Sequence, residues 1–240
     1  MDPVLSVVIP FRDEEESLRE LHVELTRVLD DLPWESELIF VDDESRDAGR
    51  MVVGELAAGD ERVRLLVLSP HRGQSAALEA GFRAARGGIV AILDADLQND
   101  PSDLPRLLAA LDRADCVCGI RSDRQDPLVK RMVSKLANSI RRLVLSDGVT
   151  DIGCSLRVIR APFLERIKLF HGAHRFLPAL LAMEGARIVE LPVRHRPRRH
   201  GSSKYGVLRR LRVVWLDLLA VAWLKRRIDR YEVKELSQRV

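Results

Sequence analysis

The sequence lacks several features that would assign it to other protein classes. It has only three cysteines, Cys116, Cys118 and Cys154, and no Cys-x-x-Cys pair. An odd number of cysteines in this arrangement argues against a disulfide framework or a structural zinc site and favours a reducing compartment. The first residues do not resemble a secretory signal, because charged residues end the early apolar run after a few positions. We therefore expect a cytoplasmic protein.

The chain also lacks a strong excess of charge of either sign. Its formal net charge is only +3, and its 46% hydrophobic and 31% charged residues are ordinary for a globular protein. A nucleic-acid-binding protein is therefore not expected. Basic residues are nevertheless concentrated locally, since five Lys or Arg and no acid lie between Arg194 and Lys204. This local excess predicts an anionic partner near the C-terminal part.

Two familiar phosphate-binding motifs are absent. No Gly-x-Gly-x-x-Gly follows the first apolar run, and no Gly-x-x-x-x-Gly-Lys-Ser/Thr occurs anywhere. The sequence therefore does not favour a dinucleotide-dependent oxidoreductase or a P-loop NTPase. An enzyme that binds a nucleotide diphosphate through a metal ion and scattered basic residues remains compatible with the sequence.

The first half of the chain alternates short apolar runs with helical patterns. Such runs are typical of strands buried on both faces of a parallel sheet. A helix is also expected after Asp100, which is followed by Pro101 and an acidic first turn. This order predicts an open, mostly parallel α/β sheet flanked by helices. The predicted strands are residues 5–9, 37–41, 63–68 and 89–93, and the predicted helices are 14–31, 47–58 and 75–86.

The second half is less regular but continues the same architecture. Its predicted strands are residues 115–120, 155–159 and 187–193, and its predicted helices are 129–145, 174–183 and 207–234. We expect residues 1–206 to form the catalytic domain and residues 207–240 to form a C-terminal amphipathic helix. The apolar segment 213–224 spans about 18 Å as a helix, which is too short to cross a hydrocarbon core of roughly 30 Å. Basic residues at both ends and two tryptophans instead favour a helix lying at a membrane surface, or packed on the core or another subunit.

Acidic residues gather where the predicted strands end. Residues 94–98 read Asp-Ala-Asp-Leu-Gln after the fourth strand, and residues 42–45 read Asp-Asp-Glu-Ser after the second. Ligands of open α/β sheets bind outside the carboxyl ends of the strands. A hard divalent cation prefers oxygen ligands and leaves positions for phosphate oxygens. The pattern predicts Mn²⁺ or Mg²⁺ held by Asp94, Asp96 and Gln98, whereas Ser45 or Asp47 can instead cap the next helix.

Seven segments, taken together and in order, resemble the family-2 glycosyltransferases with a GT-A (Rossmann-like) fold. Within them the chain is similar to the polyprenyl-phosphate branch typified by dolichol-phosphate mannose synthase. The resemblance covers residues 4–206, and the last segment favours the polyprenyl-phosphate branch. The segments are VVIPFRDEEESL (7–18), FVDDESRD (40–47), GQSAALEAG (73–81), AILDADLQNDP (91–101), GIRSD (119–123), TDIGCSLRVIR (150–160) and RRHGSSKYG (198–206).

The resemblance implies a role for individual residues. Asp96, Asp151 and Arg198 are implied to be catalytic, with Asp151 at the position proposed for the base. Arg131 and Ser134 fall where the family binds the acceptor phosphate. The residues implied to bind the donor nucleotide and its diphosphate are Pro10, Arg12, Glu14, Val41, Asp43, Asp94, Ala95, Arg121, Arg198 and Lys204.

The sequence departs from the family pattern at three places in the expected nucleotide pocket. Members usually have Asn where Asp13 stands, Gly where Glu44 stands, and Arg-Asn where Pro70 and His71 stand. Glu44 therefore adds a charge beside the expected base pocket, and the donor base stays open between guanine and uracil.

The resemblance implies an inverting, metal-dependent hexosyltransferase, similar to polyprenyl-phosphate mannosyltransferases. It would move a sugar from a GDP- or UDP-sugar to a polyprenyl phosphate such as dolichyl or undecaprenyl phosphate. A phosphomonoester acceptor has a second pKa near 6 and is largely ionised at neutral pH, so Asp151 need only orient it. One alternative is a soluble family-2 enzyme acting on a sugar or protein hydroxyl, which needs a stronger base. The other is a non-catalytic subunit that binds a sugar nucleotide.

The expected partners follow from this reaction. They are a nucleotide-sugar, a polyprenyl phosphate lipid, and either a membrane surface or a small membrane-anchoring subunit, together with further copies of the chain in a homo-oligomer. Nucleic acid is not among them. The expected location is the cytoplasm, peripheral to the cytoplasmic face of the membrane.

Overall fold

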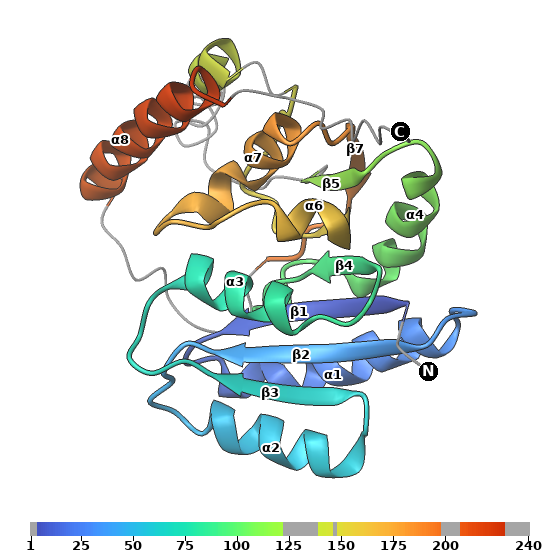
Figure 1. Cartoon of the computed structure of the whole chain (residues 1–240). Helices are drawn as coiled ribbons and strands as arrows, with labels where there is room; N and C mark the ends of the chain where they lie inside the picture. Colours follow the sequence, from blue (N-terminus) through green and yellow to red (C-terminus); the bar gives the residue numbers. More distant parts are fainter. Residues whose placement is uncertain (1–3, 122–138, 146–147, 198–206, 229–240) are drawn as a thin grey trace, which may run out of the picture.

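The structure is a computed structural model, and it describes residues 4–121, 139–145, 148–197 and 207–228. Its described strands form one sheet in the order β3-β2-β1-β4-β6-β5-β7 (Figure 1). The strands are β1 (Leu5–Phe11), β2 (Ser36–Asp42), β3 (Val63–Val67), β4 (Ile89–Ile92), β5 (Cys116–Arg121), β6 (Arg157–Arg160) and β7 (Ile188–Val193).

The sheet is mostly parallel, as predicted. β1 pairs in parallel with β2 and β4, β2 with β3, and β5 with β7, whereas β6 runs antiparallel between β4 and β5. The carboxyl ends of β1, β2, β3 and β4 therefore meet at one edge. That edge is where ligands bind in open α/β sheets.

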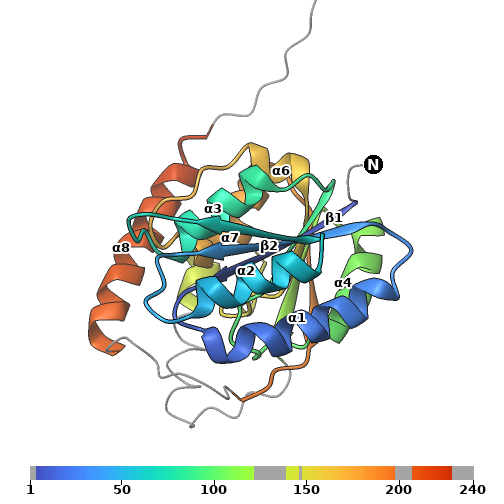
Figure 2. The same ribbon diagram turned by 90° about the horizontal axis from the view of Figure 1, so that it is seen from below.

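Helices cover both faces of the sheet (Figure 2). α1 (Glu15–Asp30), α2 (Gly49–Gly59) and α4 (Leu104–Ala109) pack on one face around the core formed with Val7, Ile9 and Phe40. α3 (Gln74–Ala84), α6 (Ala161–Glu165) and α7 (Leu177–Met183) pack on the other face. Each helix buries an apolar stripe against the sheet, which is the layer arrangement predicted from the sequence.

Local signals correctly placed most helices, with some differences at the ends. Asp100 caps the short 3-10 helix η1 (Pro101–Asp103), since its carboxylate accepts the Ser102 N–H at 3.0 Å. The helix predicted over 174–183 is instead two elements, η3 (Ala173–Phe176) and α7. Of the helix predicted over 129–145, the structure describes residues 139–145, which are helical.

The C-terminal helix α8 (Val207–Lys225) packs beside η3 and α7. Leu218 and Val221 are buried against Phe176 and Leu180. Its outer side carries exposed large apolar residues, namely Trp215, Leu216, Leu219 and Trp223. No helix in the described part of the chain is long and apolar enough to cross a membrane.

The carboxylate of Asp217 on α8 is only partly compensated for its burial. Its Oδ2 is buried, has no hydrogen-bond partner among the described residues, and lies over Gly172, where an added Cβ would be 2.8 Å away. Burial raises the pKa of Asp217, and Arg175 and His171 only partly oppose this. Because the folded-state pKa lies above the unfolded one, the folded protein binds more protons, so stability falls as the pH rises through the pKa of Asp217.

We therefore expect Asp217→Asn to stabilise the protein at pH 7. An uncharged amide of the same size avoids the cost of desolvating the carboxylate charge, a gain of about 1 kcal/mol at this partly buried site, which corresponds to about 2–4 °C in Tm for a chain of this size. The gain should shrink as the pH falls and Asp217 becomes protonated. Thermal unfolding between pH 4 and 8 measures it, with the exposed Asp112→Asn as control. A lower Tm for Asp217→Asn at pH 7 would show that Asp217 has a stabilising partner.

Candidate active site

Three strained residues mark the carboxyl edge of the sheet. Asp13, Glu44 and Leu97 have φ angles of 54°, 60° and 59°, and they are the non-glycine residues with positive φ in the described ranges. They follow the ends of β1, β2 and β4, respectively. Side chains disfavour this conformation, which costs about 1 kcal/mol or more and is concentrated at functional sites. At Glu44 this explains why the family pattern has glycine there.

The predicted metal-binding residues lie together in the turn after β4. Asp94 is partly exposed and its Oδ1 accepts a hydrogen bond from Gln74 Nε2 at 2.8 Å. Asp96 is 8% exposed and its Oδ1 accepts the backbone N–H of Gln98 at 3.2 Å. The two carboxylates therefore flank buried Ala95 in one tight turn, and Gln74 is a contact that the sequence analysis did not assign.

This turn suits a hard cation that is shared with a phosphate. Among the described residues, no group of three or more His, Cys, Asp or Glu side chains is close enough to hold a metal by itself. Mg²⁺, however, is usually held by one or two carboxylates, with substrate phosphates and water completing its shell. Asp94, Asp96 and the amide of Gln98 form an all-oxygen donor set of that kind, so they fit Mg²⁺ or Mn²⁺.

The segment that continues β7 runs alongside this turn. His195 forms an antiparallel bridge with Asn99, and the Arg196 N–H donates to the Gln98 carbonyl at 2.8 Å. The backbone that precedes the basic segment 198–206 is thus fixed next to Gln98. Arg198, which the resemblance places at the donor phosphates, is two positions further along the sequence.

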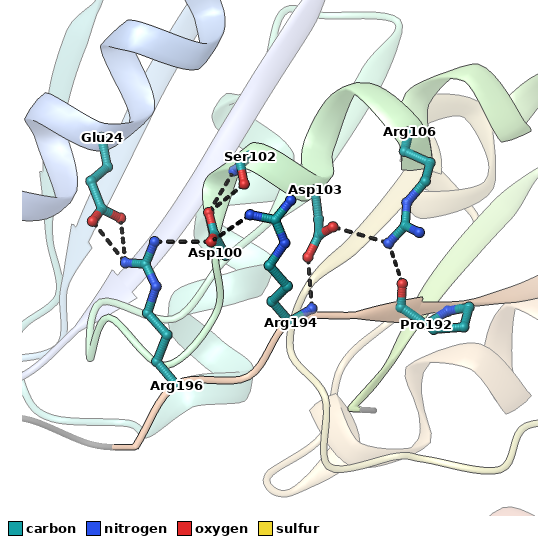
Figure 3. Close-up of polar contacts among 8 residues, drawn as sticks. All are labelled: Glu24, Asp100, Ser102, Asp103, Arg106, Pro192, Arg194 and Arg196. Atoms are coloured by element: carbon teal, nitrogen blue, oxygen red, sulfur yellow. Dashed lines mark hydrogen bonds and ion pairs between the residues drawn. The ribbon is translucent and has the colours of Figure 1, made fainter. Parts of the chain in front are cut away.

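A network of ion pairs holds this segment (Figure 3). Arg196 contacts both carboxylate oxygens of Glu24, at 2.7 and 2.8 Å, and Asp100 Oδ2 at 3.0 Å. Burial alone would raise the pKa of Asp100, but hydrogen bonds from Ser102 and Arg196 hold it below its ordinary value. Arg194 pairs with Asp100 at 3.4 Å, and its N–H donates to Asp103 at 2.7 Å. Acids of this chain therefore already neutralise two of the five basic residues that led us to predict an anionic partner.

A second group of predicted residues lies at the ends of β1 and β2. Pro10 and Val41 are buried register partners in neighbouring strands. Arg12 and Glu14 follow β1 and are partly exposed. The carboxylate of Asp43 accepts N–H groups from Arg72 and Gly73, both at 2.8 Å, in the loop after β3. The structure thus brings together the five residues implied to surround the base and ribose.

His71 is an unpredicted member of this group. Its Nδ1 lies 2.8 Å from Asp43 Oδ2, and its Nε2 lies 2.7 Å from Arg12 Nη1. The His71 N–H donates to Glu44 at 2.9 Å. The only signal in the sequence was the departure from Asn at this position.

Other acids at this edge are structural. Asp47 accepts the N–H of Gly49 and that of Glu15, both at 2.9 Å, and so serves the N-termini of α2 and α1. The N-cap residue of α2 is Ala48, so Asp47 supports the start of this helix from one position earlier than the predicted cap. The Ser45 hydroxyl instead accepts the Asp13 N–H at 3.1 Å.

Arg121 and Asp151 form a buried ion pair. Arg121 Nε and Nη2 donate to the two Asp151 oxygens at 2.8 and 2.7 Å. The Arg121 N–H and the Gly153 N–H also donate to this carboxylate, at 3.2 and 3.1 Å. Glu190 holds the adjacent backbone by accepting the N–H groups of Thr150 and Asp151. In this geometry Asp151 is the counter-ion of the Arg121 guanidinium.

Four predicted residues cannot be placed in this arrangement. Arg131, Ser134, Arg198 and Lys204 lie outside the described residues. Their assignment to the acceptor phosphate and the donor diphosphate stays a prediction.

Comparison with known proteins identifies relatives over most of the chain. The model of the family described as "Glycosyl transferase family 2" matches residues 6–168. The dodecaprenyl-phosphate galacturonate synthase of Rhizobium johnstonii is 39% identical over 236 residues, covering 94% of this chain and 69% of that protein. The undecaprenyl-phosphate 4-deoxy-4-formamido-L-arabinose transferase of Edwardsiella ictaluri is 36% identical over 213 residues, covering 88% and 66%. This chain therefore spans about two thirds of the length of these relatives.

Solved structures share the fold at low sequence identity. Glucosyl-3-phosphoglycerate synthase from Mycobacterium tuberculosis, crystallised with Mn²⁺, UDP and glucosyl-3-phosphoglycerate, superposes with a TM-score of 0.68 at 18% identity. The match covers 95% of this chain and 81% of that one. A crystal of the same enzyme with Mg²⁺ and UDP gives a TM-score of 0.68 at 17% identity. These matches confirm the predicted GT-A-type fold.

Proposed function

The chain belongs to glycosyl transferase family 2, and from this premise we propose that it transfers a sugar from a nucleotide-sugar donor to the phosphate of a polyprenyl phosphate lipid. The observation that carries the proposal is the shared edge of the sheet. There the Asp94–Gln98 turn, the residues around Asp43, and the fixed start of the basic segment all lie at one edge of the sheet. The names of the two relatives, which both act on polyprenyl phosphates, support the acceptor class.

Each part of the site has a role in this proposal. Pro10, Arg12, Glu14, Val41 and Asp43 hold the base and ribose of a UDP- or GDP-sugar. Asp94, Asp96 and Gln98 hold Mn²⁺ or Mg²⁺, which as a Lewis acid neutralises charge on the departing nucleotide diphosphate. Arg121, Arg198 and Lys204 add fixed positive charge near the same phosphates. The Mn²⁺, Mg²⁺ and UDP bound by the structural neighbour support this assignment.

Arg131 and Ser134 are the groups that we propose for the acceptor's phosphate. An ionised phosphate attacks the anomeric carbon directly, so the configuration inverts and no strong base is needed. Asp151 then acts by holding Arg121 in place.

Residues 1–206 form the catalytic unit in this proposal, and residues 207–240 its attachment to the membrane surface. Figures 1 and 2 both place α8 on the side of the molecule to which β1 and β2 point. Its exposed apolar residues and the exposed Arg226 and Arg227 suit the cytoplasmic face of an anionic membrane.

A transfer assay tests the function directly. The intact chain is incubated with UDP- and GDP-sugars, undecaprenyl phosphate and Mn²⁺, and glycosyl lipid is detected by mass spectrometry. The proposal expects metal-dependent product with a lipid phosphate and none with the corresponding alcohol. Transfer to a sugar or protein hydroxyl, with none to the phosphate, would favour the soluble-enzyme alternative.

The membrane role of α8 makes a separate prediction. We expect the protein to float with anionic liposomes at low salt and to be released as salt increases. Leu219 and Trp223 are 60% and 62% exposed. The double variant Leu219→Glu and Trp223→Glu should bind liposomes more than tenfold more weakly, because both apolar side chains would otherwise be buried in the lipid. Met51→Glu, at an exposed position of α2, is the control. If the α8 double variant and the Met51→Glu control float equally well, α8 has a packing role alone.

A further inference from the structure

The first turn of α3 joins the two groups of predicted site residues. Gly73 precedes this helix with a φ of 86°, a conformation that favours glycine, and its N–H donates to Asp43 at 2.8 Å. The next residue, Gln74, donates from Nε2 to Asp94 Oδ1 at 2.8 Å. Gln74 belongs to the segment GQSAALEAG that carries the resemblance, yet neither the metal assignment nor the donor assignment includes it.

The residue after Gln74 holds the start of α3 from the other side. The Ser75 hydroxyl lies 2.9 Å from His174 Nδ1 and accepts the His174 N–H at 3.2 Å. Ser75 is 2% exposed, so this contact with η3 lies in the interior. The backbone that carries Gln74 is therefore anchored at Gly73 and at Ser75. The side chain of Gln74 reaches Asp94 from a fixed support, which is what a group that orients another side chain requires.

The hydrogen bond from Gln74 has a direction that chemistry fixes. An ionised carboxylate only accepts hydrogen bonds, whereas an amide has two donors on Nε2 and one acceptor, Oε1. Turning the amide over would place Oε1 against the Asp94 carboxylate, where two acceptors repel each other. Nε2 therefore faces Asp94, and a bond to an ionised acceptor is among the stronger ones. A donor held at Oδ1 restricts rotation of the carboxylate about its Cβ–Cγ bond, which sets where both oxygens point.

We infer that Gln74 is a positioning residue that orients Asp94 for the cation. The inference rests on the proposed function, since it takes Asp94 as a metal ligand. A cation held by only one or two protein carboxylates depends on the orientation of each of them. Groups that hydrogen-bond to a ligand from outside the coordination shell fix that orientation, and their loss weakens metal binding by about 10- to 100-fold. Gln74 acts through Asp94 and supplies no ligand itself, in contrast to the role assigned to Gln98.

The test measures Mn²⁺ binding to the intact chain by electron paramagnetic resonance, with and without UDP or GDP. Gln74→Met keeps the length of the side chain but removes the donor, and it should weaken Mn²⁺ binding by about tenfold or more. Gln74→Asn keeps the amide but is one methylene shorter, so it should lose the same contact, and it gives the same test if Gln74→Met does not fold. Nucleotide binding without metal should stay unchanged, whereas a general disturbance of the α3 start would alter it through Gly73 and Asp43.

A double-mutant cycle with Asp94→Ala shows whether Gln74 acts through Asp94. In the Asp94→Ala background, Gln74→Met should cost no further Mn²⁺ affinity, because the side chain that Gln74 orients is gone. Arg83→Met, at an exposed position near the end of α3, is the control and should leave the Mn²⁺ affinity unchanged. An unchanged affinity in Gln74→Met, or a further loss in the double variant, would overturn the inference. Wild-type Mn²⁺ affinity in Asp94→Ala would instead count against the metal assignment of the proposed function.

Discussion

Replacing Asp96 with asparagine is expected to lower turnover by about a thousandfold or more, the effect of losing several kcal/mol of charge stabilisation on the leaving diphosphate. Asp96 is almost fully buried in the turn after β4, with Asp94 two residues earlier. Removing one anionic ligand weakens a shared cation, which is the main source of that stabilisation. The same change relieves repulsion between the two carboxylates. Stability should therefore stay equal or rise.

The measurement combines turnover, metal-dependent nucleotide binding and thermal unfolding on one preparation. Asp96→Asn should lose turnover and metal-dependent nucleotide binding but keep its Tm. Asp115→Asn is the contrasting variant, since it removes a carboxylate that pairs with Arg187 at 3.1 Å before β5 begins, and it should lower stability by up to about 1 kcal/mol while metal-dependent turnover persists. Full activity of Asp96→Asn would refute the metal assignment, and a large drop in Tm would make Asp96 a structural residue.

The sequence was sufficient for the fold because the fold depends on local patterns. Leu18, Leu21, Leu25 and Leu29 recur at helical spacing, and all of them are buried on the side of α1 that faces the sheet. The apolar runs of β1, β2 and β4 required strands covered on both faces. The turn after β4 was placed correctly because a strand end and a helix cap bound it on either side.

The errors in element boundaries also have local causes. Pro178 lacks an N–H and lies at the start of α7, so it allows a new helix to begin after η3 where periodicity alone predicted one continuous helix. α6 has only five residues, too few to show a period, and was not predicted.

Long-range pairs could not be predicted, because spacing does not encode them. Arg196 and Glu24 are 172 residues apart, yet their ion pair decides that Arg196 is a structural residue next to the site. His71 reaches Asp43 and Arg12 only because three parallel strands end at the same edge. The sequence predicted which residues are charged, and the structure determines which charges are already compensated.

Asp151 illustrates this difference, and its replacement has the second large expected effect. The resemblance implies a catalytic base, but four N–H groups donate to this carboxylate: two from the Arg121 guanidinium, and the backbone N–H groups of Arg121 and Gly153. A base needs an unoccupied lone pair facing its proton. The side chains of Arg121 and Asp151 are 15% and 6% exposed, so the pair is mostly shielded from water. We expect Asp151 to position Arg121 against the phosphates.

Asp151→Asn should therefore destabilise the protein by about 3 kcal/mol, because it removes the negative charge that pairs with the largely shielded Arg121 guanidinium. Turnover should fall about a hundredfold through the misplaced arginine. A double-mutant cycle with Arg121→Gln separates positioning from base catalysis. If the two residues act as a unit, the double variant loses no more turnover than the worse single variant. Losses that multiply, together with an unchanged free energy of unfolding in Asp151→Asn, would restore Asp151 as an independent catalytic base.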